Sequence, residues 1–146
     1  MPDTIRAELR KLLTAAAAEA ASVRLHAPVR VLARTFQSAI PVVLDALAGC
    51  ANDPARLDAV SSLVIGAGAD TAIEDLPATI AGGEGSSLWT AAQQLLDIAL
   101  PQRAGPTAGH LAKATGVPTA AAAGVLTVTA VMAMGVIARR IGTGPL

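Results

Sequence analysis

The feature that most constrains this chain is an uncharged stretch from Ala114 to Ala138. Between Pro118 and Ala138, apolar or small residues would occupy every face of a helix. A helix that is apolar all round must be covered all round. In a domain of this size, the helix must therefore lie at the centre or present its outer side to another chain.

The same stretch raises the possibility of a membrane span. Arg139 and Arg140 follow it, as cytoplasmic flanking residues would. Its many alanines, glycines and threonines add little insertion energy compared with a run of Leu or Phe. We therefore favour a buried helix and keep membrane association through residues 114–138 as a further alternative.

Composition indicates that the chain is helical. Of its 146 residues, 53% are hydrophobic, 15% are charged and 1% are aromatic, so small side chains must build the core. Alanine is the best helix former and a poor strand former, and no segment alternates convincingly with a period of two. We expect a single all-α domain over residues 1–146.

Two long apolar helices are expected at the centre of this domain. The first spans about residues 29–48, between Pro28 and Gly49, and should be kinked or broken near Pro41 because proline removes a helix hydrogen bond. The second spans about residues 118–140. The two segments resemble each other at an offset of 90 residues, since Pro28 matches Pro118 and Phe36 matches Leu126.

Shorter helices should surround this pair, giving a compact array of about six to seven helices. Residues 1–22 form an amphipathic N-terminal helix that is able to act as an arm. The other expected helices begin at the Asp53-Pro54 cap, at a Thr71/Glu74 capping box, at Ser86 or Ser87, and at about residue 107.

The residues argue against catalysis and against a metal site. The single Cys50 excludes an intrachain disulfide and a cysteine-based zinc site. His26 and His110 have no acidic residue within four positions, and both are expected at the surface or in helix caps. We predict a non-enzymatic protein with no catalytic, cofactor-binding or metal-binding residues.

Charge is distributed unevenly although the net charge is zero. Residues 1–34 carry six basic and three acidic groups, residues 35–100 carry one basic and eight acidic groups, and residues 101–146 carry four basic groups. This pattern favours neighbouring copies that pair complementary surfaces. With no basic footprint overall, we expect no nucleic-acid partner. The N-terminal residues lack the order of a secretory signal, and we expect a cytoplasmic protein.

A family resemblance rests on several short motifs. The segment 39–48, with Pro41 before Leu44 and Leu47, is followed by Asp53-Pro54, a glycine-rich loop at residues 82–85, and Leu95-Leu96. Leu111-Ala112, residues 115–117 and the final apolar helix complete the pattern. Over about residues 20–141 the chain resembles the YidB-like bacterial proteins. The resemblance implies an all-α bacterial protein without an assigned activity, and it transfers no site residues.

The leading hypothesis is a non-enzymatic protein that acts by association with a protein partner, including a second copy of itself. The apolar content exceeds what a small domain easily buries, which supports this interpretation. An alternative is a small-molecule or lipid binder with an apolar pocket between helices. The candidate interface residues of the homo-oligomer are Val128, Val131, Met132, Gly135 and Trp89.

Overall fold

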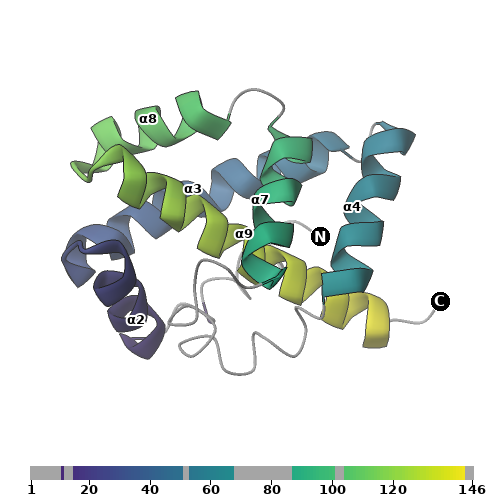
Figure 1. Cartoon of the computed structure of the whole chain (residues 1–146), viewed down its shortest axis with the longest axis horizontal. Coiled ribbons are helices and arrows are strands. Elements are labelled where there is room, and N and C mark those ends of the chain that lie inside the picture. The colour runs from purple at the N-terminus through teal and green to yellow at the C-terminus, as the bar shows by residue number, and fades with distance from the viewer. Residues whose placement is uncertain (1–10, 12–14, 51–52, 68–86, 101–103, 144–146) are drawn as a thin grey trace.

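The structure, a computed structural model, describes Lys11 and residues 15–50, 53–67, 87–100 and 104–143. These residues form helices and contain no strand, which confirms the predicted all-α fold (Figure 1). The six helices are α2 (Ala15–Leu25), α3 (Val29–Cys50), α4 (Pro54–Ala67), α7 (Ser87–Ala99), α8 (Ala104–Thr115) and α9 (Thr119–Thr143).

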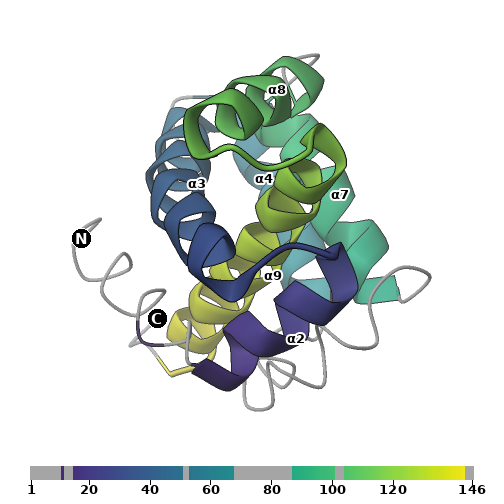
Figure 2. The ribbon, with the colours of Figure 1, turned by 90° about the vertical axis from the view of Figure 1, so that its left-hand side faces the viewer.

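Helix α9 is the centre of the arrangement. It contacts each of the other five described helices. Seen end-on, it lies between α3 and α7, with α8 on one side and α2 on the other (Figure 2). Every residue from Val125 to Val136 is buried, and this segment covers more than three helical turns. Of the two possibilities that the sequence left open, the structure therefore has the helix covered by its own chain.

Buried hydroxyls in this core find partners within their own helices. The buried polar residues in the described part of the chain are four threonines. Each donates a hydrogen bond to the carbonyl four residues earlier: Thr35 to Val31, Thr115 to Leu111, Thr127 to Ala123 and Thr129 to Val125. Because these bonds satisfy the hydroxyl donors, threonine can lie inside the core at little desolvation cost.

The two long helices begin in the same way. The Pro28 carbonyl accepts the Leu32 amide at 3.0 Å, and the Pro118 carbonyl accepts the Ala122 amide at 3.0 Å. Helices α3 and α9 are in contact at the core, as expected. Proline is suited to this position because it fixes a helical φ where no amide donor is needed.

Pro41 does not interrupt α3, so the expected break is wrong, while the alternative expectation of a kink stays a prediction. The helix runs continuously from Val29 to Cys50 with Pro41 inside it. Pro41 shares the outer face of the helix with the exposed residues Arg34 and Asp45, while Ile40 and Val43 are buried on the inner side. The Gln37 carbonyl that loses its amide partner is therefore on a side that water can reach, and inner-face packing keeps the helix whole.

The other helix starts agree with the capping signals where the structure describes them. The Asp53 carboxylate accepts the Ala55 amide at 3.1 Å, so Asp53 is the N-cap of α4. Helix α8 begins at Ala104, earlier than expected, because Pro106 falls in its first turn and removes no helix bond. The helix predicted at Thr71 lies outside the described residues, as does most of the N-terminal arm predicted over 1–22.

His26 and Gly116 are the C-terminal caps of α2 and α8. Both have positive φ, 55° for His26 and 78° for Gly116. The Ala27 amide donates to the Ser22 carbonyl at 3.3 Å, which is the bond expected one residue beyond a left-handed cap. His26, expected at the surface or in a cap, is therefore an exposed cap at a helix end.

We predict that H26G stabilises the protein and that G116A destabilises it. A left-handed φ is costly for a residue with a Cβ, so H26G should raise the free energy of unfolding by up to about 1 kcal/mol. A Cβ at Gly116 would meet nothing within 4 Å, so G116A should lower that free energy by about 1 kcal/mol through its φ alone. Urea unfolding followed by circular dichroism measures both. If H26G and G116A changed the free energy of unfolding in the same direction, this cap assignment would be contradicted.

Candidate functional site

The five candidate interface residues are all core residues in this structure. Val128, Val131 and Met132 are at most 2% exposed, Trp89 is 5% exposed, and Gly135 is buried. The first three and Gly135 are covered because α9 is central, and Trp89 on α7 joins the same core. Within one chain these residues therefore pack inside the fold, and their part in self-association stays a prediction.

We predict that M132E unfolds the protein instead of releasing folded protomers. A carboxylate in this core would have no charge partner, and burying it costs several kcal/mol, comparable with the whole stability of a small domain. The control is A120E, which places the same side chain at an exposed position of α9. Circular dichroism and light scattering distinguish the outcomes. A folded, monomeric M132E protein would contradict this prediction and support Met132 as an interface residue.

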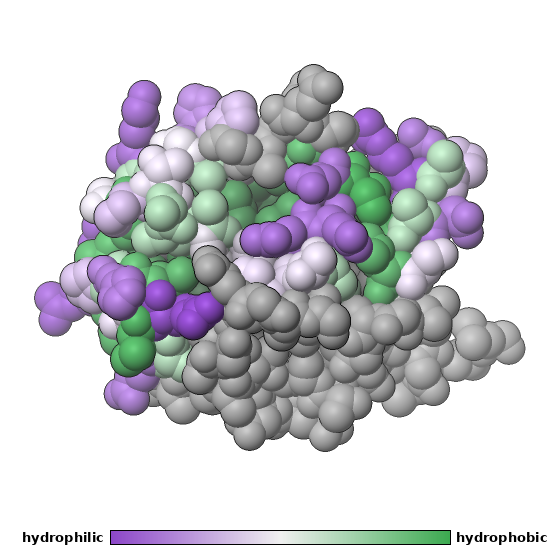
Figure 3. All heavy atoms as spheres, viewed as in Figure 1, coloured by the Kyte–Doolittle hydropathy of each residue, from purple (hydrophilic) through white to green (hydrophobic). Residues whose placement is uncertain are grey.

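A pocket of about 400 Å³ lies between α7, α8 and α9. Figure 3 shows apolar atoms recessed beside hydrophilic side chains on the face that carries these helices. Helix α7 contributes Gln93, Leu96 and Asp97, α8 contributes Ala108, and α9 contributes Thr119, Ala120, Ala123, Leu126 and Thr127. This volume is within the range typical of small-molecule sites.

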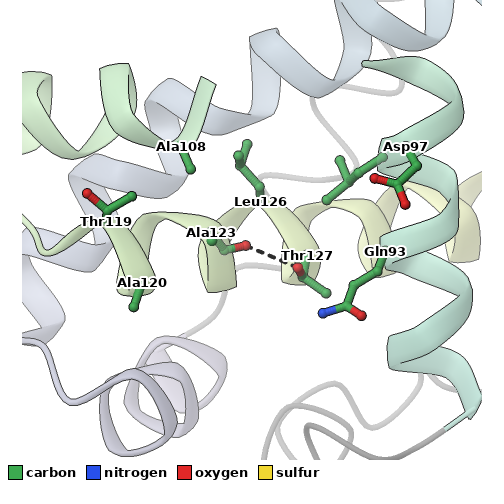
Figure 4. A pocket seen from close by; sticks show the side chains of 9 residues that line it. Gln93, Asp97, Ala108, Thr119, Ala120, Ala123, Leu126 and Thr127 are labelled. Atoms are coloured by element: carbon green, nitrogen blue, oxygen red, sulfur yellow. Dashed lines mark hydrogen bonds between the residues drawn. The ribbon is translucent and has the colours of Figure 1, made fainter. Parts of the chain in front are cut away.

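The floor of the pocket is apolar and its rim is polar. Leu96, Ala108 and Leu126 are buried at the floor, whereas Gln93 and Asp97 are exposed. In the close view, Gln93 and Asp97 project from α7 toward α9 (Figure 4). The site thus offers an apolar surface with one carboxylate and one carboxamide along a single side.

Small side chains create the hollow. Ala108, Ala120 and Ala123 occupy positions where larger residues would fill the space between α8 and α9. Thr127 donates its hydroxyl hydrogen to the Ala123 carbonyl at 3.0 Å, so this donor is already engaged inside the helix (Figure 4). The pocket wall formed by α9 is therefore mainly apolar.

None of these pocket residues was predicted from the sequence to be a binding residue. Alanines are common throughout the chain, and nothing in their order distinguishes a packed alanine from one that lines a hollow. The sequence supplied only the general expectation of an apolar pocket between helices, because the pocket depends on how α7 and α8 cross α9.

Clusters with metal-binding chemistry are absent from the described part of the chain. No three His, Cys, Asp or Glu side chains there lie close enough together to hold an ion. His110 is exposed on α8, and His26 caps α2. The described lining of the pocket contains no histidine, cysteine or lysine.

Among the residues that the structure describes, two helices are long and apolar enough to cross a membrane, judged by length and composition alone. They are the stretches Val29–Gly49 of α3 and Thr119–Val136 of α9. In an 18-residue window of each stretch, 33% and 78% of the residues, respectively, are buried within the chain. The core helix of a soluble protein meets the same criterion. The apolar residues of the α9 stretch are mostly covered by other helices of the same chain. The α3 stretch carries Arg34 and Asp45, and charged side chains are costly to place in the hydrocarbon of a membrane.

The described helices thus form an all-α protein that is built around one central apolar helix, α9. Residues 7–140 match DUF937, a family of bacterial proteins of unknown function. The match covers nearly the whole chain, and the chain belongs to this family; the resemblance to YidB-like proteins is confirmed. No curated protein and no solved structure matches the chain.

Proposed function

We propose that this protein is a non-enzymatic binding protein that holds a small amphipathic molecule in the pocket between α7, α8 and α9. The observation that carries the proposal is the pocket itself, with its buried apolar floor and its polar side. Small-molecule sites commonly combine an apolar lining with a few placed polar groups.

The lining favours a ligand with an apolar body and a cationic end. The body would lie against Leu96, Ala108 and Leu126. The Asp97 carboxylate accepts hydrogen bonds and attracts positive charge, and the Gln93 amide can both donate and accept. A ligand with an anionic end would meet Asp97 as a like charge on the same side of the pocket.

Binding without chemistry is the simplest use of these groups. The described lining offers one carboxylate, one carboxamide and two threonine hydroxyls. A nucleophile needs an adjacent base, and the Thr127 hydroxyl instead donates to the Ala123 carbonyl. Self-association is the second candidate function, and the exposed charges of α3 favour it.

We predict that octyltrimethylammonium binds the pocket more tightly than octyl sulfate, which has the same tail and the opposite charge. Titration of the ¹⁵N-labelled protein below the micellar concentration should shift the amide signals of Ala120, Ala123 and Thr127.

A123L should weaken the binding by at least roughly tenfold, because leucine fills the hollow. D97N should weaken binding of the cation by up to roughly fivefold, as expected for an exposed charge pair.

The matched control is A114L, the same substitution at an exposed position of α8 outside the pocket lining. It should leave the titration unchanged. Octanol, the neutral probe, should bind the wild type and D97N equally. Equal binding of the cation and the sulfate, or full binding to A123L, would contradict the proposal.

A further inference from the structure

We propose that the outer face of α3 is an interface between two copies of this chain, which pair their α3 helices antiparallel about a two-fold axis. The interface would set Arg34 of each copy against Asp45 of the other. This inference is independent of the pocket between α7, α8 and α9, since none of the α3 residues lines it.

Helix α3 is covered less fully by its own chain than α9 is. In an 18-residue window of its apolar stretch Val29–Gly49, 33% of the residues are buried, against 78% for Thr119–Val136 of α9. Val42 remains partly exposed beside the outer face, as do Val31 and Leu44, which also pack against the core. A second chain on this side would complete the burial of these side chains, which is the usual driving force for association.

The outer face carries a defined pattern of charge. One side of the helix is formed by residues at spacings of four, seven, four and three: Arg30, Arg34, Pro41, Asp45 and Ala48. Arg30, Arg34 and Asp45 are exposed. In the described part of the chain the ion pair is Asp53 with Arg56, so Arg34 and Asp45 have no charge partner there.

The pattern has the symmetry that an antiparallel pair needs. Helix α3 runs from Val29 to Cys50, so its midpoint falls between Ala39 and Ile40. Arg34 precedes Ala39 by five residues, and Asp45 follows Ile40 by five. When two copies cross at their midpoints in opposite directions, each Arg34 is placed beside the partner's Asp45, and two equivalent ion pairs form.

One of these charges, Arg30 in the first turn of α3, is unfavourable within a single helix. Arg30 and Arg34 lie in the first two turns of α3, and Asp45 lies near its C-terminal end. The helix macrodipole favours the opposite arrangement, with acidic residues at the start and basic residues at the end. An antiparallel partner reverses this relation, because its C-terminal end lies beside Arg30 and Arg34.

A second copy fits this face better than an unrelated partner. The face is self-complementary, as the isologous interface of a two-fold dimer must be. The chain also has zero net charge, so two copies do not repel each other as a whole.

Charge reversal tests the proposal on the full chain by sedimentation equilibrium, with circular dichroism to verify folding. The wild type should be a dimer. R34E and D45R should each weaken the dimer by roughly tenfold, since two attractive pairs become repulsive. A mixture of R34E and D45R should form heterodimers, and the double variant R34E/D45R should recover the wild-type affinity.

The controls are D58R on α4 and K113E on α8, which reverse exposed charges elsewhere and should leave the dimer intact. A wild type that stays monomeric would overturn the proposal. So would a dimer in which R34E and D45R behave like the controls, or one that the double variant fails to restore.

Discussion

The burial of α9 on all sides from Val125 to Val136 is the constraint on which the rest of this structure depends. A segment without charge from Ala114 to Ala138 has no side that favours water, so the other helices must be arranged around it. Each of the five other described helices contacts α9. Small residues permit this arrangement: a Cβ on Gly124 would overlap the Leu25 side chain, so the glycine allows the end of α2 to approach the central helix.

Helices α3 and α9 differ in charge, and the one without charge in its apolar stretch is central. Both are long, both begin after a proline, and both are apolar enough to cross a membrane by composition. Arg34 and Asp45 share one face of α3, and that face must stay near water or meet compensating charge. Helix α9 has no charge before Arg139 and can therefore be enclosed. The similarity at an offset of 90 residues thus describes helix starts and inner faces, and it does not extend to the outer faces.

The main elements of the fold could be predicted because their signals are local. Prolines, the Asp53 cap and Gly116 mark the helix ends in the sequence, and the helices begin or end near them. The continuity of α3 through Pro41 could not be predicted, because it depends on which side of the helix faces the core. Trp89, Val128 and Met132 were placed at an interface because periodicity alone cannot say whether another chain or the same chain covers an apolar side.

The pocket marks the point where the enclosure of α9 is incomplete. From Val125 to Val136 the helix is covered, whereas Ala120 and Ala123 in its first turns are exposed. At exposed helical positions, Lys, Glu and Gln form helices nearly as well as alanine and interact better with water. Alanine at both positions keeps the hollow open and apolar. Packing does not require a small residue at either position, because no other helix lies over these two side chains. The beginning of α9 is therefore the part of the central helix that faces the pocket, while Val125 to Val136 form the core.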